Sequence, residues 1–182
     1  MDTPAPSTAA ASAENTAMPP AIAAVPLGIA RHAIDILTAL AGTKIASRSR
    51  QSIRDDALLQ TNLGRAEALV RSGRAYVYEA LGEAWEVVKA GQSLTLAQRA
   101  ALWLAGTHAS NTAKEAAELM FSAGGSASPY TGSGIERCVR DIHAAAQHII
   151  LTAANYQMVG QAFLGADMRS TPLLSLDDRS GA

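Results

Sequence analysis

The side chains best able to take part in catalysis lie in one segment in the C-terminal part of the chain, Glu136 to His148. If this segment is helical, Arg137, Asp141, Ala144 and His148 share one face at spacings of four, three and four residues. Asp141 and His148 then project from the same side, two turns apart, and the alanines between them leave room for a flat molecule. Because histidine titrates near neutral pH, His148 can donate or accept a proton. Asp141 and His148 are therefore the candidate catalytic residues.

The histidines also have a structural interpretation, as hydrogen-bonded residues on a bundle face. His32 and His108 are expected to be surface or core residues of this kind. His143 and His148 are five residues apart, so they do not share a helical face well enough to hold one ion. The sequence also contains no Glu-x-x-His, which a di-iron bundle needs on two helices. We therefore predict no metal site.

Two further segments could bind an anionic or polar ligand. Gly124, Gly125 and Ser126 form a loop whose backbone N–H groups could face a phosphate or the polar edge of a cofactor, although glycines also simply end helices. Arg48 lies in a cluster of arginines that could bind an anionic group or remain a solvated face. The sequence contains none of the G-x-S-x-G, Walker or G-x-G-x-x-G motifs, so neither segment belongs to a standard nucleotide-binding or nucleophile turn.

The elements that must position these residues are expected to be helices. Ala, Leu, Arg, Glu and Gln dominate residues 27–91, and no strand pattern of useful length occurs. Four helices are predicted, at about residues 26–46, 57–89, 95–123 and from 134 to 153 or as far as 163. Long helices joined by short loops favour an all-α, four-helix up-down bundle.

Local signals set the expected helix boundaries. Pro26 suits the first turn of a helix, and Gly91 is a plausible stop. Thr95 and Gln98 match a capping box at the start of the third helix. In the fourth helix, Ile149 is expected to belong to the buried stripe.

Three glycines, Gly64, Gly73 and Gly82, recur every nine residues in the second predicted helix. Each costs about 1 kcal/mol relative to alanine in a helix. Their spacing indicates either close approach to a neighbouring helix or chance.

Composition narrows the possible partners and location. The chain has 182 residues, a net charge of -1 and a single cysteine, Cys138. The charge balance argues against nucleic acid as a partner, and without a continuous run of 18 apolar residues we expect no membrane-spanning segment. The single cysteine suits a reducing compartment, so we expect a cytoplasmic protein. Residues 1–24 are rich in Ala, Pro, Ser and Thr and are expected to be a disordered tail, with the bundle at 25–166 and a frayed tail at 167–182.

Several segments in register resemble the C-terminal helical domain of the acyl-CoA dehydrogenase superfamily, in its flavin-dependent monooxygenase branch. The last predicted helix carries the run Arg140-Asp141-x-x-Ala144-Ala145-x-x-His148, followed by Asn155 and Gly165. The Gly124-Gly125-Ser126 loop precedes it at the expected distance. The first helix opens with a similar segment, Leu27 to Ala33, and the second helix contains another, Arg65 to Ala75. The resemblance covers roughly residues 25–166.

This resemblance implies a function and a set of partners. Members of the branch use reduced flavin and oxygen to hydroxylate aromatic or heterocyclic substrates, usually with a separate flavin reductase. The resemblance implies that His148 lies beside the flavin ring, with Asp141 orienting nearby groups. It implies that Gly124, Gly125 and Ser126 approach the flavin of a neighbouring subunit, in a homo-oligomer that is expected to be a tetramer. Arg48 matches a flavin-contacting arginine more loosely, and the flavin is either FMN or FAD.

Two departures from the family pattern leave alternatives open. Acyl-CoA dehydrogenases commonly place a Tyr-Glu-Gly-Thr run, with its catalytic glutamate, where this chain has His148 to Leu151. An acyl-CoA dehydrogenase would need its base elsewhere, with Glu115 and Glu118 as candidates that are expected to face solvent. Family members also carry an N-terminal helical domain and a β domain, for which this chain has only residues 1–24. We therefore expect a truncated product, a fragment or half of a split enzyme, completed by a partner chain, or else a non-catalytic oligomerising bundle.

Overall fold

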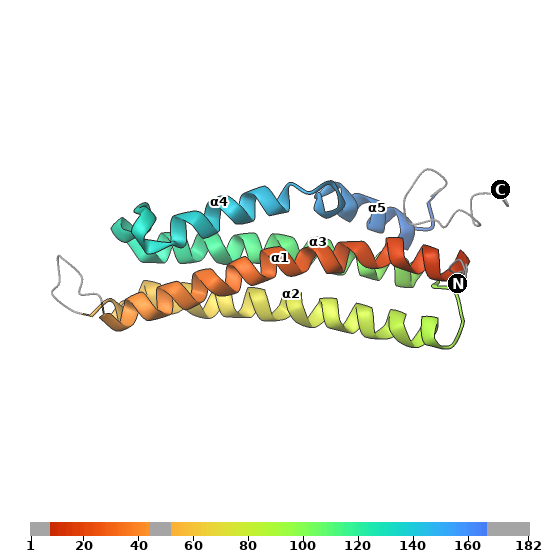
Figure 1. The fold of residues 1–182 in the computed structure, drawn as a ribbon, viewed down its shortest axis with the longest axis horizontal. Coiled ribbons are helices and arrows are strands. Elements are labelled where there is room, and N and C mark those ends of the chain that lie inside the picture. Colours follow the sequence, from red (N-terminus) through yellow and green to blue (C-terminus); the bar gives the residue numbers. More distant parts are fainter. Residues whose placement is uncertain (1–7, 44–51, 167–182) are drawn as a thin grey trace, which may run out of the picture.

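The computed structural model describes residues 8–43 and 52–166 of the chain, and in these ranges it consists of helices and loops without a strand. The elements are packed into an elongated bundle in which neighbouring long helices run in opposite directions (Figure 1). The all-α prediction is confirmed. The five α-helices are α1 (Thr8–Thr43), α2 (Ala57–Lys89), α3 (Leu96–Gly124), α4 (Ile135–Ala146) and α5 (Ala154–Phe163).

Helices α2 and α3 begin and end where the sequence predicts. The Asp56 carboxylate accepts hydrogen bonds from the N–H groups of Leu58 and Leu59, at 2.7 and 3.2 Å, which satisfies two of the open donors of the first turn of α2. The Thr95 and Gln98 side chains form the predicted capping box of α3. Gly91 follows α2 with a φ of 73°, a conformation that glycine adopts without steric cost.

The core is built largely from alanine, which lets the helices lie close together. Its main cluster joins α1, α2, α3 and α4, and its largest fully buried side chains include Ile34, Leu37, Met120, Ile135 and Ile142. Burying such a side chain contributes about 1.5–3 kcal/mol. Helix α3 lies at the centre, in contact with every other α-helix.

Glycines mark the closest approaches between helices. A Cβ atom at Gly73 of α2 would lie 2.7 Å from Thr112 Oγ1 and 3.1 Å from the backbone of Ala109 in α3. The close-approach interpretation is therefore correct for Gly73. It does not hold within the chain for Gly64 and Gly82, where an added Cβ would meet nothing within 4 Å.

Helix α1 begins earlier than predicted, so the expectation of disorder is wrong for residues 8–24. Pro19, Pro20 and Pro26 all lie inside α1, and the first two are fully buried. Each proline removes one helical hydrogen bond. The packing of α3 accommodates Pro19, because Gly106 has no side chain and a Cβ there would overlap Pro19. Pro26 is consequently an interior residue rather than a first-turn residue, while residues 1–7 and 167–182 lie outside the described ranges.

Helix α1 contains a long apolar segment. Its segment Thr16–Gly42 has a mean hydropathy of 1.4, and by length and composition alone it could cross a membrane. Core helices of soluble proteins meet the same criterion, and Ile34 and Leu37 of this segment are buried against the other helices. The expectation that nothing spans a membrane stays a prediction.

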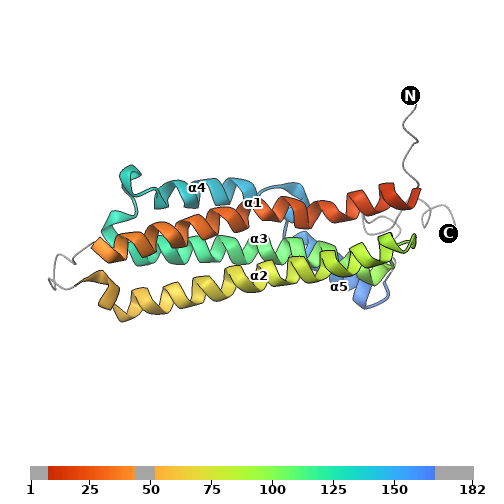
Figure 2. The same cartoon turned by 60° about the horizontal axis from the view of Figure 1, so that its bottom comes forward.

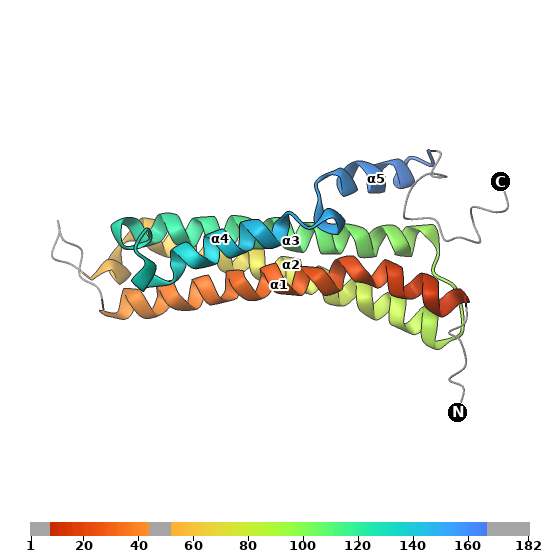
Figure 3. The same ribbon diagram turned by 45° about the horizontal axis from the view of Figure 1, so that its top comes forward.

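The predicted fourth helix is interrupted, which changes the geometry of the candidate site. Helix α4 ends at Ala146, His148 is extended with φ -60° and ψ 129°, and a short 3-10 helix at Ile149–Leu151 leads to α5. Helix α5 then lies along α3 and away from α1 (Figure 3). The prediction of one continuous helix from residue 134 to beyond 153 is wrong, and so is the burial of Ile149, which is 80% exposed.

Candidate functional site

A cleft of about 720 Å³ lies between α1 and the beginning of α4. One wall comes from α1 and is largely apolar, while the other comes from the loop before α4 and from α4 itself. The lining residues are Ala24, Val25, Gly28, Ile29, His32, Gly132, Ser133, Gly134, Arg137, Cys138 and Asp141. A flat molecule with one apolar face and a polar edge fits such walls.

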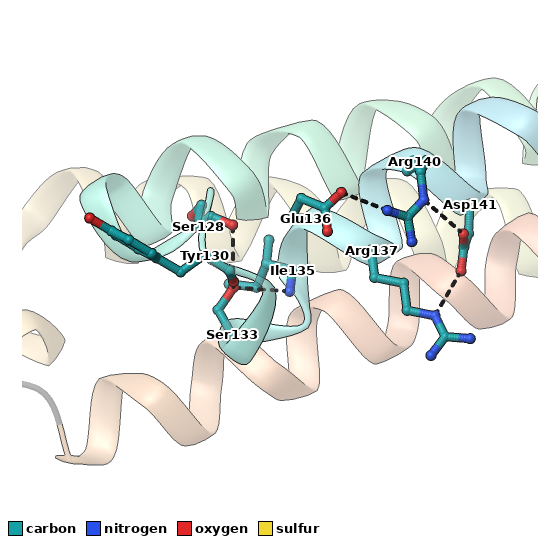
Figure 4. A network of polar contacts seen from close by, with 8 residues as sticks. All are labelled: Ser128, Tyr130, Ser133, Ile135, Glu136, Arg137, Arg140 and Asp141. Atoms are coloured by element: carbon teal, nitrogen blue, oxygen red, sulfur yellow. Dashed lines mark hydrogen bonds and ion pairs between the residues drawn. The ribbon is translucent and has the colours of Figure 1, made fainter.

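The polar wall is organised by ion pairs along α4 (Figure 4). Arg137 Nε lies 3.3 Å from Asp141 Oδ2, and Arg140 Nε lies 3.7 Å from Asp141 Oδ1. Arg140 also pairs with Glu136 at 2.9 Å. Asp141 therefore lies between two guanidinium groups, and its two carboxylate oxygens each contact one of them.

The loop before α4 is held by the Ser133 hydroxyl (Figure 4). Ser133 Oγ lies 2.8 Å from the carbonyl oxygen of Tyr130, to which it can donate, and accepts from the Ile135 N–H at 3.3 Å. Gly134 caps the helix with a φ of 74°, which a residue with a side chain rarely adopts. These contacts keep the N-terminal turn of α4 at the mouth of the cleft.

Cys138 lies at the buried side of the cleft and is only 4% exposed. Burial, and then the charge of Asp141, raise the pKa of the thiol, while Arg137 lowers it. The thiol consequently stays protonated at neutral pH and does not act as a nucleophile.

His148 is exposed and has one defined hydrogen bond. Its Nδ1 accepts from the Ile150 N–H at 3.3 Å, so the side chain caps the 3-10 helix that follows. An accepting Nδ1 places the proton of the neutral ring on Nε2. Nε2 is therefore the nitrogen available to exchange a proton with a ligand.

The predicted placement of Asp141 and His148 on one helical face is wrong. His148 lies beyond the end of α4, and it is not among the residues that line the cleft, whereas Asp141 is. Within the described residues, Asp141 is paired with Arg137 and Arg140 rather than with His148. The continuous helix on which the pairing depended does not exist.

Gly124, Gly125 and Ser126 end α3, as predicted. Gly124 is buried, and a Cβ there would overlap the Ser128 side chain, so its lack of a side chain is required by packing. Gly125, with a φ of 57°, and Ser126 are exposed. The 12 residues of α4, about 18 Å long at the rise of an α-helix, lie between this loop and His148 in the chain.

The structure describes two of the three remaining predicted residues, Glu115 and Glu118, but not the third. Arg48 lies outside the described residues. Glu115 and Glu118, the alternative bases, are exposed on α3 as expected, and each has a partner: Arg65 at 3.3 Å and His143 at 3.0 Å, respectively.

Asn155 has a positioning role that its sequence context alone could not define. Its buried side chain donates to Thr107 Oγ1 of α3 at 2.9 Å and to the Ile150 carbonyl at 2.6 Å. These bonds tie the segment that carries His148 to the central helix. His32 was also missed: it was expected to be an ordinary surface or core residue, and it lines the cleft.

Comparison with known proteins gives a family and a set of related enzymes. Residues 21–153 match the model for the acyl-CoA dehydrogenase C-terminal domain. The indole-3-acetate monooxygenase of Pseudomonas putida is 35% identical over 144 residues, which are 79% of this chain and 37% of that protein. The enzyme of the same name from Acinetobacter baumannii is 25% identical over 141 residues, 78% of this chain and 36% of that protein. The chain thus spans little more than a third of the length of these relatives.

Solved structures show the same fold at lower sequence identity. The 3-HSA hydroxylase from Rhodococcus sp. RHA1 superposes with a TM-score of 0.78 at 19% identity, covering 88% of this chain and 40% of that one. XiaF from Streptomyces sp., solved in complex with FADH2 and glycerol, also gives 0.78, at 22% identity, covering 84% and 39%.

Proposed function

The chain belongs to the family of acyl-CoA dehydrogenase C-terminal domains, and from that premise we propose that it forms the helical part of a flavin-dependent monooxygenase. The observation that carries the proposal is the 35% identity to the Pseudomonas putida indole-3-acetate monooxygenase across most of the bundle. We propose an aromatic or heterocyclic substrate, for which the apolar wall formed by Val25 and Ile29 is suited. The hydrogen-bonding groups of the opposite wall would then meet the polar edge of the substrate.

The exposed surface at His148 fits a flavin. Ile149, 80% exposed, offers apolar area beside the His148 ring, whose Nε2 can exchange a proton. When bound, reduced flavin supplies the electrons with which oxygen is activated, so that one oxygen atom enters the substrate and the other leaves as water. The contribution of this chain is to place a proton donor and acceptor, Nε2 of His148, at the edge of the site. The role of Asp141 is to hold Arg137 at the cleft.

Further parts of the proposal concern partners and location. We propose a homo-oligomer, expected to be a tetramer, in which Gly124, Gly125 and Ser126 approach the flavin of a neighbouring copy. The length of α4, about 18 Å, which lies between this loop and His148 in the chain, supports a division of the two contacts between copies. Reduced FAD or FMN would come from a separate reductase, the remaining walls of the site from domains outside this bundle, proposed to be carried by a partner chain, and the location would be cytoplasmic.

The experiment is a calorimetric titration of the purified chain with reduced and oxidised FAD and FMN under anaerobic conditions. His148→Ala is expected to weaken binding of the reduced flavin at least threefold. His143→Ala is the matched control, because His143 is an exposed histidine of α4 that pairs with Glu118. Equal loss in both variants, or no binding by a folded chain, would count against a flavin site and in favour of a non-catalytic bundle.

A further inference from the structure

The His148 ring is oriented by a hydrogen bond that is both long and exposed. Its Nδ1 accepts from the Ile150 N–H at 3.3 Å, whereas bonds from a backbone N–H are commonest at roughly 2.9–3.0 Å. Water competes for the two groups of an exposed bond, so such a bond contributes little by itself. The orientation of the ring therefore depends on how firmly Ile150 is held.

Ile150 is held from its other side by short and buried contacts. The Asn155 amide group donates to the Ile150 carbonyl oxygen at 2.6 Å and to Thr107 Oγ1 at 2.9 Å. Asn155 is 6% exposed, and Thr107, in the central helix α3, is fully buried. Because few water molecules can reach these groups, the two bonds fix Asn155 and Ile150 relative to α3. A chain of hydrogen bonds thus runs from the centre of the bundle to the His148 ring.

The attachment of α5 to α3 does not account for this arrangement by itself. Asn155 lies in the first turn of α5, and its bond to Thr107 already joins the two helices. Asn111 of α3 provides a second link, at 3.3 Å from the Tyr156 hydroxyl. The shorter bond of Asn155 instead reaches back to Ile150, outside α5, in the 3-10 helix that His148 caps. This bond connects α3 to the segment that orients the histidine.

The contact has a consequence for the proton on the ring. A neutral imidazole carries one proton, and the nitrogen that accepts a hydrogen bond is the one without it. While the Ile150 N–H faces Nδ1, the proton lies on Nε2, and His148 offers a hydrogen-bond donor to a ligand. If Ile150 turns away, Nδ1 can take the proton, and Nε2 is left as an acceptor.

We propose that Asn155 and Thr107 are positioning residues that fix the tautomer of His148 through Ile150. They thereby select a ligand with a hydrogen-bond acceptor, an oxygen or nitrogen lone pair, facing Nε2. The inference rests on the proposed function for the identity of that ligand, a flavin. The tautomer itself is a property of the chain alone and can be measured without a flavin.

Nuclear magnetic resonance of the full chain with ¹⁵N-labelled histidine measures the tautomer. Spectra are recorded in alkaline buffer, where a histidine ring is neutral, and His148→Ala identifies the His148 signals among those of the four histidines. In the wild type, the ¹⁵N shifts are expected to show a protonated Nε2 and an accepting Nδ1. Asn155→Ala is expected to lower the ratio of the Nε2–H to the Nδ1–H form about fivefold. This is the change in an equilibrium constant that loss of one ordinary hydrogen bond causes.

Variants of Thr107 separate positioning from general loss of stability. Thr107→Val removes the hydroxyl with little change in volume and is expected to lower the same ratio about twofold, because Asn155 keeps its bond to Ile150. Thr107→Ser keeps the hydroxyl and is expected to restore the wild-type ratio. Asn111→Ala is the matched control, since Asn111 links α3 to Tyr156 and not to Ile150, and it is expected to leave the ratio unchanged.

Two results would overturn the inference. One is an unchanged ratio in folded Asn155→Ala and Thr107→Val, which would mean that Ile150 holds its place without them. The other is an equal fall in Asn111→Ala, which would show general loosening. If Asn155→Ala does not fold, the difference between Thr107→Val and Thr107→Ser decides the question.

The calorimetric titration with reduced flavin shows whether Asn155 acts through His148. Asn155→Ala is expected to weaken binding, and the double variant with His148→Ala is expected to bind no more weakly than His148→Ala alone, because both changes affect one group. Additive losses would overturn the inference. A wild-type chain that binds no flavin but shows the expected tautomer ratios would overturn the proposed function and leave the positioning of His148 standing.

Discussion

Replacing Asn155 by alanine tests what holds the His148 segment in place. The Asn155 amide group donates at 2.9 Å to Thr107 Oγ1 and at 2.6 Å to the Ile150 carbonyl, and the residue is 6% exposed. Alanine removes both bonds and leaves the buried Thr107 hydroxyl and the partly buried Ile150 carbonyl without this donor. Each bond contributes about 1 kcal/mol, and an unsatisfied buried acceptor costs about 1–3 kcal/mol. We therefore expect a loss of about 2–3 kcal/mol.

Asn111→Ala is the matched control. Asn111 also links α3 and α5, with its amide 3.1 Å from the Thr107 carbonyl and 3.3 Å from the Tyr156 hydroxyl, but it is more exposed. Its replacement is expected to cost less than about 1 kcal/mol, because water can satisfy the groups that it leaves.

Thermal unfolding followed by circular dichroism measures the difference. For a domain of this size, 1 kcal/mol corresponds to about 2–4 °C. Asn155→Ala is expected to lower the midpoint by about 4–12 °C and Asn111→Ala by no more than about 4 °C. Similar midpoints for Asn155→Ala and the wild type would refute the reasoning that these two bonds hold the interrupted helix in its bent course.

Three other predictions follow from the packing, the caps and the ion pairs. Gly73→Ala forces a Cβ atom against α3 and is expected to lower the free energy of unfolding, measured in urea, by about 1–2 kcal/mol. Gly28→Ala adds a Cβ atom in open space and is expected to raise the free energy of unfolding by up to about 1 kcal/mol. A rise for both variants would contradict the close approach at Gly73. Thr95→Ala is expected to cost about 1 kcal/mol through loss of the cap, and an unchanged urea midpoint would contradict that role. The hydrogen bond from Arg31 lowers the pKa of Glu67 below its ordinary 4.5, so the stabilisation is present above pH 4.5 and lost as the pH falls through the lowered pKa. Glu67→Gln is therefore expected to be less stable than the wild type at pH 7 and equal to it near pH 2, and a difference that persists in acid would contradict the linkage.

The helices whose signals are local were predictable from the sequence. Helix α2 begins and ends at the predicted residues, because Asp56 caps it directly and Gly91 provides the turn that follows. The capping box of Thr95 and Gln98 likewise depends on residues three positions apart. Short-range chemistry of this kind can be recognised without knowledge of the tertiary structure.

The start of α1 was not predictable in this way. Three prolines and an alanine-rich composition favour disorder in this segment. The contact of Pro19 with Gly106, which has no side chain, favours the helix instead. The two residues are far apart in the sequence, so neither reveals the other.

The candidate site was predicted in its residue types but not in its geometry. No glycine or proline marks the end of α4 at Ala146, and the segment that follows is tied to α3 by the hydrogen bonds of Asn155. His148 consequently moves off the helical face shared with Asp141. The cleft also depends on His32 of α1, whose proximity to α4 only the fold reveals.

The central claim is that this bundle can serve as the helical part of a flavin-dependent monooxygenase. The most direct measurement replaces the matched 144 residues of the Pseudomonas putida indole-3-acetate monooxygenase with the corresponding residues of this chain. The product is then analysed for oxygen from labelled O₂ in the presence of reduced flavin. We expect labelled product from the chimaera, a loss of at least tenfold with His148→Ala, and little change with His143→Ala. A folded, flavin-binding chimaera that yields no labelled product, or that is indifferent to His148→Ala, would contradict it.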